Sequence, residues 1–124
     1  MEERQMNLDM IRSSFPDFQI ENFRMFDQIT LLKWEKVLDE NSWEEHKNLV
    51  LEMTSPHNYK ILIEFIDVNS LRFRGNGQIS GFYIMDMTER GYENNVKYEV
   101  GDYEEDEIQF YCSDVVVKNF LDLN

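Results

Sequence analysis

The chain is poor in the residues that build disulfides and metal sites. One cysteine and two histidines occur among its 124 residues. A single cysteine cannot form an internal disulfide. The histidines show no HxH or HExxH spacing, and no CxxC pair is present. We therefore expect neither a metal nor a cofactor.

Segments that mark targeting or modular proteins are also missing. No apolar run reaches about 18 residues, the length typical of a membrane span. Met1-Glu2-Glu3-Arg4 does not begin a secretory signal. Internal repeats, low-complexity tracts and linkers are absent from the sequence. These features predict one domain, residues 1–124, in the cytoplasm.

What the chain does contain is apolar and acidic. Hydrophobic residues make up 42% and aromatic residues 14%, enough to build a core and to exclude intrinsic disorder. The formal net charge is −13, unevenly distributed. Residues 47–85 hold three acids and four bases, whereas residues 86–107 hold nine acids and two bases. Such a field repels nucleic acid and anionic membranes and attracts basic proteins.

Alternating hydrophobicity is clearest between residues 96 and 118. A period of two describes strands with one apolar and one solvated face. A β-bulge at Gly101 would turn Tyr103 toward the core opposite Ile108 and leave Glu105-Asp106 as a two-residue turn. The predicted apolar face comprises Val96, Tyr98, Val100, Ile108, Phe110 and Cys112.

Further strands precede this hairpin. The run Tyr59–Ile66 is apolar at nearly every position, which predicts a central strand covered on both faces. Gly75-Asn76-Gly77 supplies positive-φ residues for a hairpin whose return strand is Ile79–Met87. Residues Ile29–Leu38 fit a helix or a strand, and their β-rich surroundings favour the strand.

The N-terminal part has a weaker pattern. Asn7 can cap a short helix that places Leu8, Ile11 and Phe15 on one face. The aromatic segment 18–26 is expected to be extended. Together these elements predict a mainly β (α+β) fold, an antiparallel sandwich or strongly curled sheet of about eight strands with one short N-terminal helix.

Catalytic signals are weak. Cys112 shares the apolar face of its strand, which favours an inert buried thiol. Adjacent carboxylates carry no information about acid–base pairs in so acidic a chain. A small-ligand or enzymatic module stays open as an alternative, with Trp34, Trp43 and His46 as the place to search for a pocket.

Binding is better supported, by an acidic tip comprising Asp102, Glu104, Glu105, Asp106 and Glu107. Adjacent carboxylates repel one another unless a cation or a basic partner neutralises them. Carboxylates around an aromatic anchor suit the lysines and arginines of a protein partner. The aromatic and acidic residues expected to complete the surface are Tyr103, Tyr92, Glu93 and Tyr111.

Four stretches of the central and C-terminal strands form a pattern like that of a known family. They are Phe65-x-x-Val68-x-x-Leu71-x-Phe73, Gln78-Ile79-Ser80-Gly81-Phe82-Tyr83-Ile84, Tyr98-x-Val100-x-x-Tyr103-Glu104 and Ile108-x-Phe110-x-Cys112. Through them the chain resembles, across about residues 47–118, small acidic bacterial immunity proteins, which are encoded beside polymorphic or contact-dependent toxins. The resemblance implies a stoichiometric inhibitor of a cognate toxin domain, often a nuclease.

The sequence thus predicts a non-enzymatic binding protein, with a basic protein such as a toxin domain as its partner and no direct contact with nucleic acid or membrane. A nucleic-acid mimic that inhibits a DNA-binding protein is the second hypothesis. The oligomeric state is left open.

Overall fold

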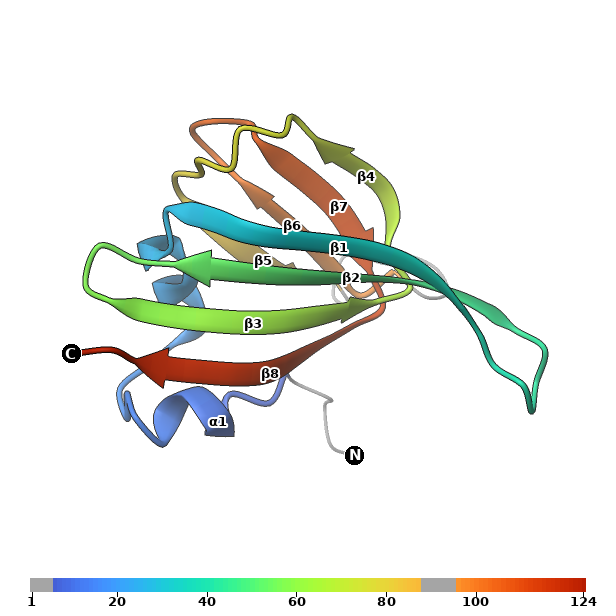
Figure 1. Ribbon diagram of the computed structural model, residues 1–124, viewed down its shortest axis with the longest axis horizontal. Coiled ribbons are helices and arrows are strands. Elements are labelled where there is room, and N and C mark those ends of the chain that lie inside the picture. Colours follow the sequence, from blue (N-terminus) through green and yellow to red (C-terminus); the bar gives the residue numbers. More distant parts are fainter. Residues whose placement is uncertain (1–5, 88–95) are drawn as a thin grey trace.

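Two antiparallel sheets of four strands face one another in the computed structural model, which describes residues 6–87 and 96–124 (Figure 1). The predicted mainly β, antiparallel architecture is confirmed. The first sheet has the order β1 (Gln28–Leu38), β2 (Glu45–Thr54), β3 (Tyr59–Ile66) and β8 (Asp114–Asp122). The second has the order β4 (Asn69–Phe73), β7 (Ile108–Cys112), β6 (Tyr98–Asp102) and β5 (Phe82–Asp86).

The core lies between the inner faces of the two sheets. Every second residue is buried from Leu49 to Met53 in β2 and from Ile61 to Phe65 in β3, as a period of two requires. Phe65 of β3 and Phe110 of β7 meet across the sandwich as an edge-to-face pair with ring centroids 4.9 Å apart. The fully buried side chains of β2 and β3 are Leu49, Leu51, Met53, Ile61, Ile63 and Phe65.

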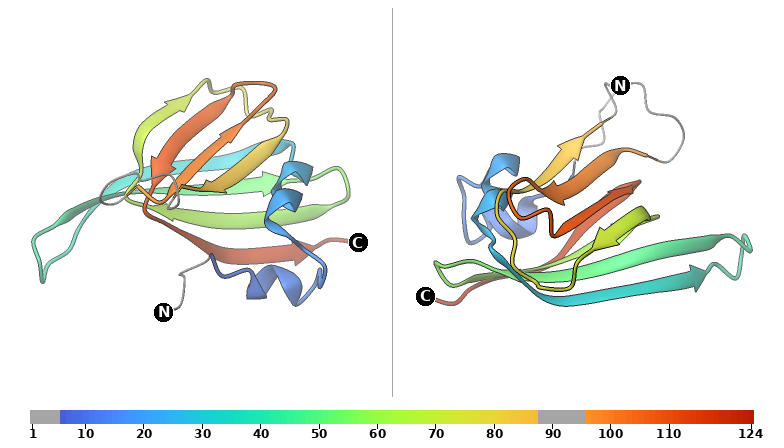
Figure 2. Two further views of the ribbon diagram at one scale, coloured as in Figure 1. Left: turned by 180° about the vertical axis from the view of Figure 1, so that it is seen from behind. Right: turned by 90° about the horizontal axis from the view of Figure 1, so that it is seen from above.

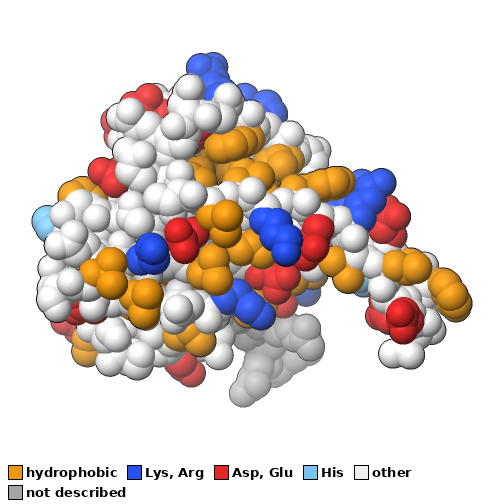
Figure 3. Space-filling model, viewed as in Figure 1, with side chains coloured by type: hydrophobic (Ala, Val, Ile, Leu, Met, Phe, Trp, Pro, Cys, Tyr) orange, Lys and Arg blue, Asp and Glu red, His pale blue; other side chains and the backbone are white. Residues whose placement is uncertain are grey.

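The outer face of the first sheet is open to solvent. Leu62 and Glu64 of β3 are only half-buried, so the prediction that both faces of this strand are covered is wrong. Ion pairs join neighbouring strands there, with Lys60 Nζ 3.8 Å from Glu52 Oε1. Figure 3 shows this face as hydrophobic side chains mixed with both signs of charge.

The helical elements lie before β1. Asn7 Oδ1 accepts the Asp9 N–H at 2.8 Å at the start of α1 (Asp9–Arg12), a single turn beside β8 (Figure 1). The segment predicted to be extended contains instead the 3₁₀ helix η1 (Ile20–Met25). The tight winding of the 3₁₀ helix suits the irregular spacing of the aromatic residues. The rings of Phe18 and Phe23 contact each other in the core, with centroids 5.0 Å apart.

Gly75 and Gly77 have the predicted positive φ angles, +93° and +85°. The predicted hairpin is wrong, however, because β4 and β5 occupy opposite edges of the second sheet. Gly77 reaches β1 instead, where its carbonyl accepts the Ile29 N–H at 2.7 Å. A Cβ on Gly77 would lie 3.0 Å from the Ile29 carbonyl oxygen, so this contact between the sheets favours glycine.

The hairpin of β1 and β2 projects beyond the second sheet (Figure 2). The strand predicted for Ile29–Leu38 is confirmed, and its register with β2 is unbroken from Leu31 to Leu38. Trp43, in the loop that joins these two strands, is 74% exposed and does not cover the core.

The Phe65–Phe110 contact predicts a large difference between two phenylalanines. Phe65→Ala leaves a cavity at a fully buried site and should lower the free energy of unfolding by about 3–5 kcal/mol. Phe73→Ala, at a site that is 38% exposed, should cost about 1 kcal/mol or less. Urea denaturation of both variants checks this, and equal costs would contradict the assigned core.

Candidate binding surface

The loop between β6 and β7 differs from the predicted two-residue turn. Gly101 pairs regularly with Gln109 and Tyr83, and the loop spans residues 103–107. No bulge occurs at Gly101; a Cβ there would lie 2.9 Å from the hydroxyl oxygen of Tyr83. The glycine therefore allows the Tyr83 ring to lie across β6. Tyr103 does not face the core, because it is 66% exposed.

Asp102 organises this loop from inside. Its side chain is buried, and Oδ1 accepts the N–H groups of Glu107 at 2.8 Å and Ile108 at 3.0 Å. Oδ2 accepts the N–H groups of Glu105 at 3.2 Å and Ser80 at 3.4 Å. This one carboxylate thereby accepts hydrogen bonds from backbone N–H groups that the loop could not otherwise satisfy.

Two more carboxylates of the acidic tip have partners within the chain. Glu107 is 2% exposed, and its Oε2 accepts the Gly77 N–H at 2.6 Å. Asp106 lies 3.2 Å from an Arg72 guanidinium nitrogen and 3.9 Å from one of Arg74. The hydrogen bond and charge of Arg72 hold the pKa of Asp106 below its usual value.

The prediction that the carboxylates of the acidic tip need a cation or a basic partner to neutralise them is therefore wrong for Asp102, Asp106 and Glu107, which have partners within the chain. Glu104 and Glu105 are exposed. Asp106 is exposed too but is paired with Arg72. The exposed acids of the tip without a basic partner in the described chain are therefore Glu104 and Glu105, beside Tyr103.

Tyr103 is part of an aromatic cluster on the outer face of the second sheet. Its ring stacks on that of Tyr83, with centroids 4.3 Å apart and planes 23° from parallel. Tyr83 donates its hydroxyl hydrogen to Glu99 Oε2 at 2.5 Å. Tyr111, half-buried on β7, is the strand partner of Glu99. We call Tyr83, Tyr103, Tyr111 and Glu99 the tyrosine face.

The hydroxyl group of Tyr83 holds its proton tightly. Burial, and then the hydrogen bond to Glu99, raise the pKa of Tyr83, and the charges of Tyr103 and Tyr111 act in the same direction. Tyr83 is thus a neutral hydrogen-bond donor whose ring supports Tyr103. An open groove of about 560 Å³ continues from these rings toward η1, where Ile20 and Arg24 line it.

The structure brings together only some of the predicted site residues. Tyr103, Glu104 and Glu105 lie at one end of the tyrosine face, and Tyr111 lies on it. Tyr92 and Glu93 lie outside the described residues. Tyr83 and Glu99 were not predicted, although both fall on the polar parity of their strands.

A second polar cluster joins β2 to the turn after β3. His46 Nδ1 lies 2.6 Å from Asp67 Oδ1, and Ser113 donates its hydroxyl hydrogen to Asp67 Oδ2 at 3.2 Å. His46 and Ser113 thus bind the same carboxylate, which lies between them. In this arrangement the serine has no general base beside its hydroxyl group, as a catalytic serine would need. Asp67 has φ +56°, so this cluster holds a tight turn in place.

Reactive and metal-binding groups are scarce in the described ranges. Burial raises the pKa of Cys112 to about 12, which keeps its thiol protonated at neutral pH. Residues 6–87 and 96–124 contain no group of three or more His, Cys, Asp or Glu side chains able to hold a metal ion. Nor does this part of the chain have a helix long and apolar enough to cross a membrane.

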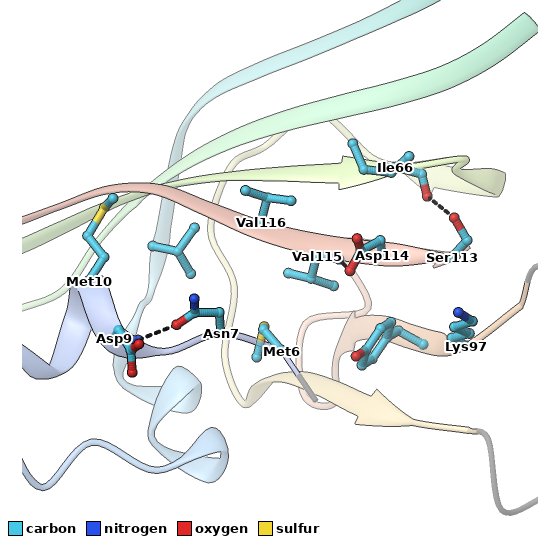
Figure 4. A pocket seen from close by; sticks show the side chains of 12 residues that line it. Met6, Asn7, Asp9, Met10, Ile66, Lys97, Ser113, Asp114, Val115 and Val116 are labelled. Atoms are coloured by element: carbon cyan, nitrogen blue, oxygen red, sulfur yellow. Dashed lines mark hydrogen bonds between the residues drawn. The ribbon is translucent and has the colours of Figure 1, made fainter. Parts of the chain in front are cut away.

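A hollow of about 840 Å³ lies between α1 and β8 (Figure 4). Much of its lining is apolar, with Met6 and Met10 on one side and Val116 on the other. Two of its polar side chains bind backbone groups: Asn7 accepts the Asp9 N–H, and Ser113 binds the Ile66 carbonyl. The remaining polar side chains of its lining are Asp9, Lys97, Tyr98 and Asp114.

The tryptophan pocket considered from the sequence has no counterpart in these hollows. Trp34 and Trp43 are 44% and 74% exposed and line neither the groove beside the tyrosine face nor the hollow at α1. No family model, curated protein or solved structure matches this chain.

The role of Asp102 predicts a stability difference within the acidic tip. Asp102→Ala leaves buried N–H groups of residues 107 and 108 unpaired, which should cost about 2–4 kcal/mol. Glu104→Ala removes an exposed carboxylate and should change stability by about 0.5 kcal/mol or less. Denaturant titration measures both, and a tolerated Asp102→Ala would refute the assigned role.

The His46–Asp67 contact predicts a pH-dependent stability. The hydrogen bond and charge of Asp67 raise the pKa of His46 above its ordinary value of 6.5. Its contribution is therefore complete below pH 6.5 and is lost as the pH rises through the folded-state pKa. Relative to His46→Gln, the wild type should lose stability as the pH rises from 6.5 through the folded-state pKa. A stability difference that stays constant over this range would exclude the ion pair.

Proposed function

We propose that this protein is a non-enzymatic, immunity-type inhibitor that binds a basic surface of a cognate bacterial toxin domain through its tyrosine face. The observation that carries the proposal is the exposed ring of Tyr103, stacked on Tyr83 and followed directly by the exposed acids Glu104 and Glu105. An aromatic anchor beside carboxylates is suited to arginine and lysine side chains.

Rigidity makes this surface suitable for tight binding. Tyr103 is fixed by its ring stack and by its N–H, which donates to the Gly81 carbonyl at 3.2 Å. Asp102 fixes the loop that follows through its bonds to backbone N–H groups. A surface that is already ordered loses little conformational entropy when a partner binds.

The net charge supports the same kind of partner. At −13 the chain attracts basic proteins over a distance that depends on salt. The internal pairs of Asp102, Asp106 and Glu107 do not remove that long-range field, because only Asp106 is paired with basic side chains. The charge directs the encounter, and the tyrosine face makes the short-range contacts.

A binding role agrees better with the described polar groups than catalysis does. The thiol of Cys112 is buried and protonated, and His46 is bound to a carboxylate in the turn after β3. Neither group opens on the groove beside Tyr83, which is lined by Tyr103, Glu104, Glu21, Arg24 and Asp86.

The product of the gene adjacent to this one is the first partner to test. In stopped-flow mixing at low salt, Glu104→Lys/Glu105→Lys should slow association by about 10- to 100-fold, and added salt should diminish the difference. Asp17→Lys/Glu40→Lys makes the same change in net charge at exposed sites outside the surface and should have a smaller effect. Equal effects of the two variants would contradict a local contact.

A second pair of variants tests the aromatic anchor. Tyr103→Ala should speed dissociation of the complex by about 10-fold or more, as expected for a ring at the centre of an interface. Phe73→Ala removes an exposed ring from the edge strand β4 and should leave dissociation unchanged. Displacement of the partner by duplex DNA would instead support a nucleic-acid mimic, and failure of the two proteins to associate would refute the proposal.

A further inference from the structure

β1 is an edge strand whose outer side is only partly occupied. At its beginning, Ile29 donates its N–H to Gly77, and the Asp27 carbonyl accepts the Ile79 N–H at 3.0 Å. From Thr30 to Leu38, no strand of the described chain lies on this outer side. The edge formed by residues 30–38 therefore displays unpaired backbone groups, which are able to pair with another strand.

The opposite edge of the same sheet is in a different situation. β8 is flanked by α1 and the residues before it, and Met6 and Met10 lie near Val116 (Figures 1 and 4). The free edge of this sheet thus belongs to β1. It is nine residues long, and its midpoint is Trp34.

The backbone N–H and C=O groups of Trp34 point away from β2, toward the free edge of the sheet. Asp39 donates its N–H to the Glu44 carbonyl at 2.9 Å, which directs the peptide groups of the odd-numbered residues from Leu31 to Val37 toward β2. The register shift between Ile29 and Leu31 reverses this alternation at the beginning of the strand, where Ile29 points outward. The Lys47 carbonyl points the other way, to Val68, and its strand partner is Lys36. Even-numbered residues from 32 to 38 therefore present N–H and C=O groups at the edge, since these groups alternate along a strand.

We propose that this edge pairs with the same edge of a second copy of the chain, antiparallel, about a two-fold axis at Trp34. An axis at an outward-pointing residue makes that residue and its symmetry mate exchange two backbone hydrogen bonds. Because the free edge is centred on Trp34, this arrangement pairs residues 30–38 of one copy with residues 38–30 of the other. The two four-stranded sheets become one sheet.

Charge selects this register over its neighbours. With the axis at Trp34, Lys33 of each copy lies directly opposite Glu35 of the other, so two cross-strand ion pairs form. A two-fold axis at Lys33 would place Lys33 of one copy directly opposite Lys33 of the other. An axis at Glu35 would place the two Glu35 side chains opposite each other. Like charges directly opposite one another destabilise both alternatives.

The apolar residues agree with the same register. Leu31 and Val37, which are 45% and 37% exposed, lie opposite each other on the outer face. On the inner face, the Trp34 side chain, 44% exposed in the single chain, meets its symmetry mate. Pairing therefore covers exposed apolar surface, the feature that makes a long edge strand prone to association.

Sedimentation equilibrium of the intact protein tests the dimer. From about 5 to 500 μM the average mass should rise from 15.0 kDa toward twice that value. Lys33→Glu and Glu35→Lys should each weaken dimerisation by about 10-fold or more, since each creates two like-charge contacts. Lys33→Glu/Glu35→Lys should restore it. Lys60→Glu, on the same face of a central strand, should leave it unchanged.

Cysteine substitution tests the register separately. Under mild oxidation Trp34→Cys should form a disulfide-linked dimer, because symmetry mates at the axis are about 5.5 Å apart at Cα. Val37→Cys, which lies opposite Leu31 of the other copy, should not. The native Cys112 is buried and should not cross-link in either variant.

A mass that stays at 15.0 kDa throughout would overturn the proposal, and so would a double variant that fails to restore a dimer lost in the single ones. Cross-linking through Val37→Cys but not through Trp34→Cys would exclude the register. These results are independent of the toxin-binding proposal, because β1 and the tyrosine face belong to different sheets.

Discussion

The candidate surface depends on one buried carboxylate. Asp102 ends β6 and accepts N–H groups from Glu105, Glu107 and Ile108 on the following residues and from Ser80 on a neighbouring segment. These bonds close the loop that carries Tyr103. Without them the loop would have unsatisfied donors at the edge of the core, and the exposed ring would have no fixed position on Tyr83.

This arrangement changes the meaning of the acidic tip. In the sequence, five carboxylates near one turn indicate a cluster that repels itself. In the structure, Asp102 and Glu107 turn inward to bind backbone N–H groups, and Asp106 pairs with Arg72. The same residues that give the chain its acidity also build the loop. Glu104 and Glu105 are left to face solvent, which makes the surface smaller and more sharply defined.

Alternation along single strands was readable from the sequence. The buried positions of β7, Ile108, Phe110 and Cys112, follow a period of two, and Tyr111 falls between them on the outer face. The Ile29–Leu38 strand was identified because its surroundings are β-rich. Local patterns of this kind report which side chains face apolar surroundings.

Pairing between distant strands was not readable. Gly75-Asn76-Gly77 has the conformation of a turn, yet β4 and β5 separate to opposite edges of the sheet. Tyr83 joins Tyr103 only because β5 pairs with β6 and Gly101 leaves space for a ring. Such contacts depend on the order of strands in the sheet, which local periodicity does not encode. For the same reason the burial of Asp102 and Glu107 could not be inferred from their neighbours.

Hydrogen exchange of this chain, free and bound to the product of the adjacent gene, tests the central claim most directly. The account predicts that binding slows exchange at residues 81–85 and 103–105, which carry the Tyr83–Tyr103 stack and the two exposed acids. Slowed exchange confined to other parts of the chain, with these two segments unchanged, would contradict it.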